Sequence, residues 1–208
     1  RQALAVVTCG GRLGSGFFVD GERLLTNAHV TCGAGAPLDV KLPDGRVLPG
    51  RVRTLDDWLD YAVVEVPGAG VASPLPLGDS TALVAGSPVV LVGSPLGLEA
   101  TVHAGKVSYA ARNLQGVAHV QVNADVNPGN SGGPLLDGGG RAVAIVTLKA
   151  EGAGGVGFAL PVEYARAALD APSKDPEAAR RWSAVAARVR QEDDAEAARL
   201  VARLEQPM

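Results

Sequence analysis

A serine enclosed by glycines is the residue of this sequence best suited to act as a nucleophile. It lies in the segment Asn127-Pro128-Gly129-Asn130-Ser131-Gly132-Gly133-Pro134. Glycines let the backbone turn tightly and leave the hydroxyl of Ser131 accessible. They also allow the neighbouring amides to point at one spot, as the binding of an oxyanion requires. The same segment is compatible with a Gly/Asn turn that only joins two strands.

A serine hydroxyl needs a base that takes its proton and a carboxylate that holds the base in one tautomer. His29, which follows the sequence Leu-Thr-Asn-Ala, is the candidate base. Asp60 opens the apolar run of residues 61–66 and is the candidate carboxylate, with Asp56 and Asp57 near enough to compete. These residues predict a nucleophilic serine site, while each of them alone is compatible with a structural role.

The pattern Gly-x-Ser-x-Gly around Ser131 also occurs at the nucleophile of α/β-hydrolases, which need a helix after the serine and a histidine later in the chain. Here a strand-like run follows Ser131, and all three histidines (His29, His103 and His119) precede it. The sequence therefore excludes that arrangement. We expect His103 and His119 to be structural and no metal or cofactor to be needed, because no cluster has the spacing of metal ligands.

Most of the chain has the pattern of β structure. Short runs rich in Val and Leu occupy residues 5–8, 16–19, 38–42, 61–66, 88–92, 117–122, 142–148 and 157–160, and all 27 glycines lie at or before Gly157. Short strands separated by Gly, Pro, Asp and Asn clusters predict a sandwich or barrel. With 47% hydrophobic residues and a net charge of −3, the composition excludes a disordered chain and gives no basic surface for nucleic acid. No apolar stretch is long enough to span a membrane.

The last part of the chain has a helical pattern instead. Residues 162–208 hold 17 of the 41 charged residues and no glycine, and Asp175-Pro176-Glu177 supplies an N-terminal helix signal. We predict one short helix over residues 161–169 and a helical tail from about residue 175, whose apolar stripe would pack on the β domain. The expected division is a β domain over residues 1–165 and a charged helical extension over residues 166–208.

The order His29, Asp60, Ser131, with separations of 31 and 71 positions, resembles the chymotrypsin-fold serine proteases, and within them the bacterial HtrA/Deg branch. Five segments carry the resemblance, which covers about residues 4–165: Gly14-Ser15-Gly16-Phe17-Phe18-Val19 with Leu25-Thr26-Asn27-Ala28-His29-Val30, Leu77-Gly78-Asp79-Ser80, Gly93-Ser94-Pro95-Leu96-Gly97, the serine segment through Leu135, and Gly157-Phe158-Ala159-Leu160-Pro161.

The resemblance implies an all-β fold of two perpendicular six-stranded β-barrels, with a catalytic triad in the cleft between them. His29 would be the base and Asp60 its orienting carboxylate, and the family pattern favours Asp60 over its neighbours. The backbone amides of Gly129 and Ser131, with Asn130 nearby, would hold the oxyanion. The implied activity is that of a serine endopeptidase acting on protein or peptide substrates in quality control or extracellular proteolysis. The alternative is an inactive protease-like scaffold that only binds peptides.

The resemblance also assigns substrate-binding residues. Thr147, Leu148 and Lys149 lie where relatives pair the substrate backbone as an added strand, and Thr147 is also placed to contact Asp60. Val126 lies in the loop that lines the specificity pocket, for which relatives prefer small aliphatic side chains. Asp125, six positions before Ser131, would instead select Arg or Lys if it faced the pocket.

Several features depart from the HtrA/Deg pattern. The helical tail stands where relatives carry PDZ domains, and the N-terminal aromatic residues of the family's trimer are absent, so a monomer and a trimer both stay open. Cys9 and Cys32 lie in regions that animal trypsin-like proteases join by a disulfide, with two unpaired thiols as the alternative. A disulfide implies an oxidising compartment, the periplasm or outside of the cell. Because the chain opens at Arg1, we expect any export signal upstream of it.

Overall fold

The computed structural model of the chain describes residues 2–94, 100–114, 116–124, 126–149 and 155–170. These residues form twelve strands and one α-helix. In chain order they are β1 (Leu4–Cys9), β2 (Arg12–Phe18), β3 (Arg23–Thr26), β4 (Pro37–Lys41), β5 (Val47–Asp56), β6 (Tyr61–Glu65), β7 (Pro88–Gly93), β8 (Thr101–Leu114), β9 (Val117–Val122), β10 (Pro134–Leu136), β11 (Ala142–Lys149), β12 (Gly157–Pro161) and α1 (Val162–Asp170). Two 3₁₀ turns, η1 (Ala28–Val30) and η2 (Ser80–Ala82), lie between strands.

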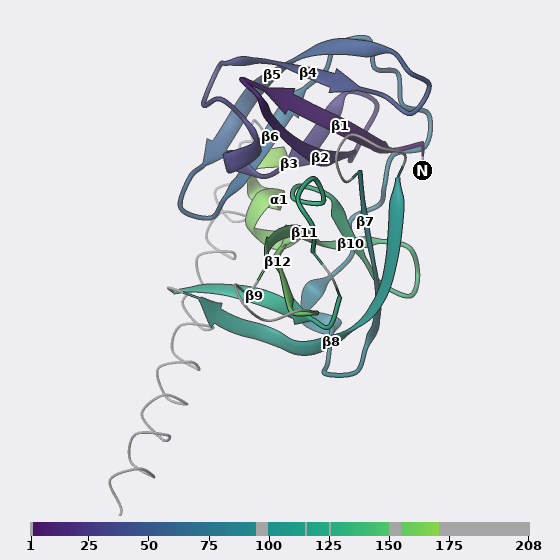
Figure 1. Ribbon diagram of the computed structural model, residues 1–208, viewed down its shortest axis with the longest axis vertical. Helices are drawn as coiled ribbons and strands as arrows, with labels where there is room; N and C mark the ends of the chain where they lie inside the picture. The colour runs from purple at the N-terminus through teal and green to yellow at the C-terminus, as the bar shows by residue number, and fades with distance from the viewer. Residues whose placement is uncertain (1, 95–99, 115, 125, 150–154, 171–208) are drawn as a thin grey trace, which may run out of the picture.

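The strands close into two antiparallel barrels of six strands each, which confirms the predicted fold class. The first barrel has the strand order β1-β2-β3-β6-β5-β4, and the second has the order β10-β11-β12-β9-β8-β7. Figure 1 shows the first barrel, in purple and blue, above the second, in teal and green. Closure leaves neither barrel with an unpaired edge strand.

Local sequence explains the first hairpin. Strands β1 and β2 are joined by Gly10 and Gly11, with φ of +54° and +82°, and Cys9 pairs with Arg12 across the turn. A two-residue hairpin of this kind needs left-handed backbone at both central positions, where glycine has no steric penalty. The turn therefore sets the register of β1 on β2 and brings Ser15 opposite Val6.

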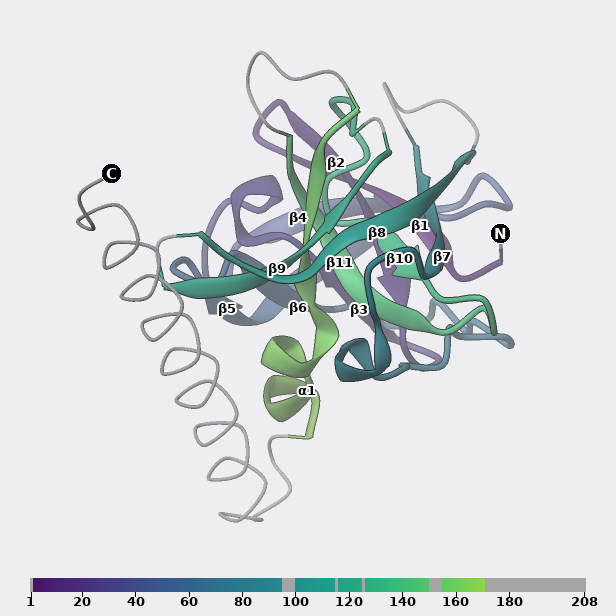
Figure 2. The same ribbon diagram turned by 90° about the horizontal axis from the view of Figure 1, so that it is seen from below.

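Three apolar clusters fill the molecule. One lies inside the first barrel and another inside the second. The third joins the two barrels and packs them on α1; it includes Phe17, Leu25, Val63, Ile145, Leu160, Val162 and Leu169. Figure 2 shows α1 outside the strands on one side of the molecule. The buried carboxylate of Glu163 in α1 accepts hydrogen bonds from the amide and hydroxyl of Ser80, at 2.9 and 2.6 Å, which fixes the helix to the link between the barrels.

Eight strands coincide with the Val/Leu runs of the sequence, and α1 confirms the short helix predicted over residues 161–169. Four strands have no such run: β3 and β10 are very short, while β5 and β8 are largely exposed and carry many polar residues. Exposed strands need few apolar side chains, so hydrophobic pattern alone does not detect them. The predicted tail lies outside the described residues, and the division at residue 165 stays a prediction. No described helix is long and apolar enough to cross a membrane.

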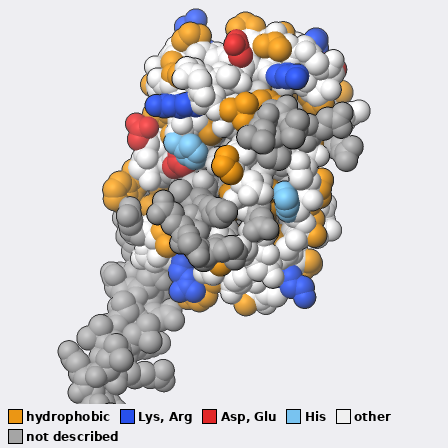
Figure 3. Space-filling view, viewed as in Figure 1, with side chains coloured by type: hydrophobic (Ala, Val, Ile, Leu, Met, Phe, Trp, Pro, Cys, Tyr) orange, Lys and Arg blue, Asp and Glu red, His pale blue; other side chains and the backbone are white. Residues whose placement is uncertain are grey.

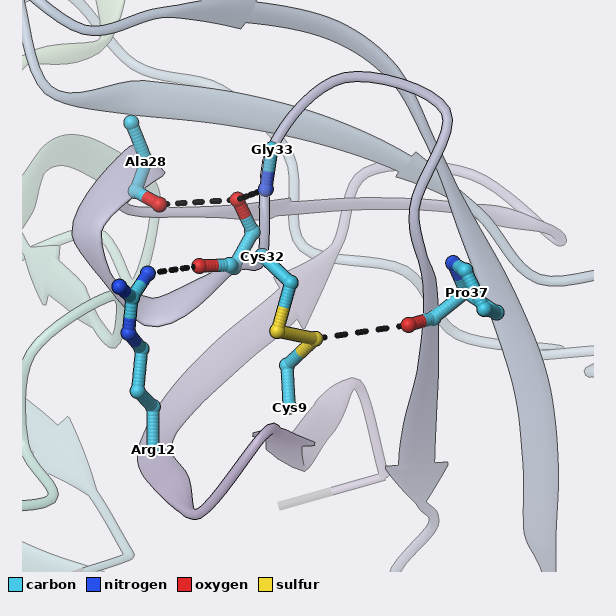
Figure 4. The surroundings of a disulfide bond; sticks show 7 residues. Cys9, Arg12, Ala28, Cys32, Gly33 and Pro37 are labelled. Carbon is cyan, nitrogen blue, oxygen red and sulfur yellow. Dashed lines mark hydrogen bonds between the residues drawn. A yellow bond between two sulfur atoms is a disulfide. The ribbon is translucent and has the colours of Figure 1, made fainter.

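A disulfide joins Cys9 and Cys32 with a Cα–Cα distance of 5.9 Å, as predicted (Figure 4). It links the end of β1 to the residue that follows η1 and Thr31. Arg12, also visible in Figure 4, donates from its guanidinium to the carbonyl of Thr31. Both contacts tie the residues that follow the histidine-bearing turn to the hairpin of β1 and β2.

We expect Cys32→Ala to lower the free energy of unfolding by about 3 kcal/mol, because the bridge closes a loop of 23 positions. Cys32 is exposed whereas Cys9 is buried, so this variant removes the bridge with little loss of packing. Denaturant unfolding measures the effect. Reductant should bring wild type to the stability of the variant and leave the variant unchanged; equal stability of oxidised and reduced wild type would contradict the prediction.

His119 in β9 makes the stability of the fold depend on pH. The side chain is buried, and its Nδ1 lies 3.0 Å from the carbonyl oxygen of Val117. Burial lowers the pKa of His119 below its ordinary value, against smaller opposing effects of the Val117 carbonyl and the charge of Asp60. The unfolded chain therefore binds a proton at higher pH than the folded chain, and stability falls as the pH drops below about 6.5.

We expect the free energy of unfolding of wild type to fall between pH 7 and 5, with a His119 contribution of up to about 1.4 kcal/mol per pH unit. His119→Gln should remove that contribution, so the difference between the two curves isolates His119. The check is urea unfolding at each pH. Parallel curves for wild type and variant would show that His119 does not carry the effect.

Candidate active site

His29 and Asp60 are joined by a set of short hydrogen bonds in the first barrel. Nδ1 of His29 lies 2.8 and 3.0 Å from the two carboxylate oxygens of Asp60, and the backbone amide of His29 donates to Oδ1 at 2.9 Å. The imidazole in its neutral form donates from Nδ1 to this acceptor, which leaves Nε2 unprotonated. The His29 side chain is about half exposed, at 48%. Figure 3 shows a histidine adjoining an acidic side chain on the face also seen in Figure 1.

The backbone of Asp60 has an uncommon conformation. Its φ of +60° is the one left-handed value among the described non-glycine residues, and Asp tolerates this region better than most residues. The side-chain nitrogen of Asn27 donates to the Asp60 carbonyl at 2.7 Å, which stabilises the conformation at the start of β6. Asn27 is fully buried and comes two positions before His29.

The other two candidate aspartates, Asp56 and Asp57, lie in the turn that leads to Asp60. The carboxylate of Asp56 accepts from the amides of Trp58 and Leu59, at 3.0 and 2.9 Å, and so shapes the turn that leads to Asp60. Asp57 is exposed in the same turn. Of the three candidates, Asp60 is the one whose carboxylate contacts His29.

Ser131 lies just after a tight turn in the second barrel. The amide of Asn130 donates to the carbonyl of Asn127 at 2.9 Å, and Gly129 has a φ of +97°. Proline at the second position and a left-handed glycine at the third are typical of a type II turn. Among the described residues, the amides of Gly129 and Ser131 have no hydrogen-bond partner, so they are available to an anion. The hydroxyl of Ser131 donates to the carbonyl of Thr147 at 3.4 Å.

Asn130 differs from the expectation that it assists the oxyanion. Its amide is used inside the turn, and its side chain is fully buried with no hydrogen-bond partner among the described residues. The side chain packs on Gly93, where an added Cβ would lie 2.5 Å from Oδ1 of Asn130. Two amide donors, those of Gly129 and Ser131, are therefore left for the role.

The turn of Ser131 lies against the turn of His29. A Cβ added to Gly14 in β2 would lie 2.6 Å from the side chain of Val30, next to His29, and 2.9 Å from the carbonyl of Ser131. Gly14 is thus the contact point of the two turns. This close approach requires a residue without a side chain at position 14.

Thr147 joins the two halves of the site, although not by the predicted contact with Asp60. Its buried hydroxyl accepts from the side chain of Asn27 at 3.0 Å and donates to the carbonyl of Ile145 at 3.0 Å. Among the described residues it makes no hydrogen bond to the Asp60 carboxylate. A bulge between Val146 and Leu148 takes Thr147 out of the regular ladder of β11 and β12, and its carbonyl receives the hydroxyl of Ser131.

The expected specificity residues are described in part. Val126 is buried in the core of the second barrel, where a Cβ added to Gly157 would lie 2.4 Å from it. Leu148 and Lys149 lie in β11, paired with Phe158 and Gly157. Asp125 lies outside the described residues. No group of three or more His, Cys, Asp or Glu side chains suited to a metal ion occurs in the described part of the chain.

Ser15 and Asn27 were not predicted as site residues from the sequence, yet both bind backbone groups of the site. Each is fully or almost fully buried. A polar residue inside an apolar strand or beside a catalytic candidate is the signal that finds such residues, because buried polar groups are nearly always hydrogen-bonded.

Comparison with known proteins places these observations in one family. Residues 14–145 match the family described as Trypsin-like peptidase domain. Over 163 residues the chain is 42% identical to the putative serine protease HhoA of Synechocystis, covering 74% of this chain and 41% of that protein. It is 37% identical to a probable periplasmic serine endoprotease DegP-like of Halomonas elongata, covering 83% and 38%.

A solved structure, the HtrA-type protease AlgW with tripeptide, has a TM-score of 0.74 and 32% identity, and the match covers 83% of this chain and 60% of that one. The chain spans about two fifths of the length of the curated relatives given above. The histidine and serine turns described here both lie within the matched residues 14–145. The chain belongs to the family of trypsin-like peptidases, and within that family it resembles the HtrA/Deg proteins.

Proposed function

We propose that this chain is a serine endopeptidase that cleaves peptide bonds through Ser131, His29 and Asp60. The observation that carries the proposal is the paired hydrogen bond between Nδ1 of His29 and the Asp60 carboxylate. It leaves Nε2 as the basic atom and places the carboxylate where it stabilises the imidazolium. The names of the relatives, which are serine proteases, support the same chemistry.

The proposed reaction has two stages, and in each of them His29 takes up a proton and gives it back. The oxygen of Ser131 attacks the carbonyl carbon of the peptide bond while Nε2 of His29 takes its proton. The negative oxygen of the tetrahedral intermediate accepts hydrogen bonds from the amides of Gly129 and Ser131. His29 then gives its proton to the departing amine, which breaks the C–N bond. Water, deprotonated by His29, then attacks the resulting ester of Ser131, and His29 returns the proton to the serine oxygen as the C–O bond of the ester breaks.

A peptide-binding scaffold without activity is the second candidate. The observation in its favour is that the Ser131 hydroxyl points to the carbonyl of Thr147, at 3.4 Å. For catalysis the hydroxyl must turn from this carbonyl toward His29. Because the 3.4 Å hydrogen bond is long, this rotation costs little, and we favour the enzyme.

We expect a fluorophosphonate probe to label wild type on Ser131 and to leave Ser131→Ala unlabelled, because the probe reacts with activated serines.

Asp60→Asn should lower kcat on a peptide substrate by about 10⁴-fold, since the histidine then loses its orienting carboxylate. Asp57→Asn, an exposed carboxylate in the same turn, is the matched control and should stay within about twofold of wild type. Unlabelled wild type, or equal labelling of Ser131→Ala, would favour the scaffold.

For the residue before the cut bond, we propose a small or medium aliphatic side chain. Val126 and the neighbouring Gly157 lie together in the second barrel, and apolar walls of this kind favour an apolar partner. A pocket with the Asp125 carboxylate at its base is the alternative, and it would select Arg or Lys. Thr147, Leu148 and Lys149 would pair the substrate backbone as an added strand.

We expect wild type and Asp125→Ala to give the same aliphatic profile on a peptide library. The measurement is the sequence of the cleaved products. Asn123→Ala, an exposed neighbour of the same loop, serves as the matched control. Cleavage after Arg or Lys in wild type that disappears in Asp125→Ala alone would overturn the aliphatic proposal.

The proposed cellular setting is the periplasm or the outside of the cell, with a role in protein quality control or extracellular proteolysis. Two observations support the location: the disulfide, which persists in oxidising compartments, and the DegP-like relatives named as periplasmic.

A further inference from the structure

A buried hydroxyl in the first barrel reaches the turn of the proposed nucleophile, and the reaction above does not use it. Ser15, in the middle of β2, is 1% exposed. Its Oγ donates to the carbonyl of Gly129 at 2.6 Å and accepts from the amide of Ser94 at 2.8 Å. One hydroxyl of the first barrel thus binds two segments of the second barrel, the serine turn and the residue that follows β7.

The backbone of Ser15 makes a further contact with the same turn. Its amide donates to the carbonyl of Ser131 at 2.8 Å, and its carbonyl accepts from the hydroxyl of Thr26 at 2.7 Å. Gly129 and Ser131 are the two residues whose amides remain available to an anion. Ser15 therefore holds both of these residues by their carbonyls.

A turn that contains glycine needs hydrogen bonds of this kind to stay in one conformation. Gly129, with its φ of +97°, has no Cβ to restrict it, so the turn has other accessible conformations. In those conformations the amide of Gly129 points elsewhere, and catalysis by oxyanion binding depends on donors that are already in place. The bond on the Gly129 carbonyl fixes the Gly129–Asn130 peptide plane, whose amide closes the turn on Asn127, and the bond on the Ser131 carbonyl fixes the Ser131–Gly132 plane. The planes that carry the amides of Gly129 and Ser131 adjoin these two planes, so the two bonds limit how far those amides can turn.

The glycines of the serine turn pack closely against Ser15. A Cβ added to Gly132, whose φ is +86°, would lie 2.1 Å from the carbonyl oxygen of Ser15, and one added to Gly133 would lie 3.4 Å from the Ser15 Cβ. On the other side, Gly93 is in contact with Asn130. The turn is thus enclosed between β2 and the end of β7, with Ser15 as its polar contact.

We propose that Ser15 is a positioning residue that holds the amides of Gly129 and Ser131 in the orientation that binds the oxyanion. This inference rests on the proposed function, because it assigns the amides the same role. Ser15 acts through the turn and touches neither the substrate nor His29. Its loss should therefore affect the stabilisation of the transition state and leave the binding of the peptide unchanged.

The kinetic test compares Ser15→Ala with Ser80→Ala. Ser80 is a buried serine whose hydroxyl also makes a 2.6 Å bond, to Glu163, away from the site. We expect Ser15→Ala to lower kcat on a peptide substrate at least tenfold with KM within about twofold, and to keep the pH midpoint of kcat/KM. Ser80→Ala should keep the kcat of wild type. Equal kcat in the two variants, or an effect of Ser15→Ala on KM alone, would overturn the inference.

Amide exchange gives a second readout that needs no activity. The amide of Asn130 is bonded inside the turn to Asn127, so its hydrogen exchange, followed by NMR, reports how often the turn opens. We expect exchange at least tenfold faster in Ser15→Ala and unchanged in Ser80→Ala. If wild type does not hydrolyse peptides but this difference is found, the proposed function fails while the anchoring by Ser15 stands. Unchanged exchange in Ser15→Ala overturns the anchoring, whatever the activity.

Discussion

One side-chain nitrogen of Asn27 donates to the carbonyl of Asp60 in its own barrel at 2.7 Å and, across the boundary between the two barrels, to the hydroxyl of Thr147 at 3.0 Å. Asn27 is fully buried, and its bond to Thr147 is buried as well, so water does not compete for that bond. The first bond stabilises the left-handed backbone of Asp60, and the second fixes the strand whose carbonyl receives Ser131. Two of the three proposed catalytic residues lie in the first barrel and Ser131 lies in the second. Their relative positions therefore depend on the hydrogen bonds of Asn27.

The apolar clusters and the hydrogen bonds have different roles in positioning the site. The cluster between the barrels, which contains Phe17, Leu25 and Ile145, sets how the barrels meet, but apolar contacts are not directional. Hydrogen bonds from Asn27, Ser15 and Arg12 then set the orientation of individual turns, because they depend on both distance and angle. The site thus lies on turns that a rigid scaffold supports, which is the common arrangement for catalytic groups.

Local pattern predicted a β-sandwich or barrel and the residues of a nucleophilic serine site, whereas the fold of two barrels was implied by the family resemblance. Val/Leu runs located eight strands. The exposed strands β5 and β8 were not detected, since pairing with their neighbours and not an apolar face keeps them extended. The choice of Asp60 over Asp56 and Asp57 came from resemblance alone. The structure gives its physical reason: the Asp56 carboxylate is already used by the amides of its own turn.

The available groups follow from the sequence alone: a serine between glycines, three histidines and several carboxylates ahead of it, two cysteines and the turns that glycine permits. Tertiary structure decided which of these groups meet. Ser15 and Gly129 are 114 positions apart, and Asn27 and Thr147 are 120 positions apart. It also decided that the amide of Asn130 is used within its turn while those of Gly129 and Ser131 are left open. Contacts of this kind depend on how the two barrels close and pack, and no local pattern specifies the partner of a hydrogen bond so far along the chain.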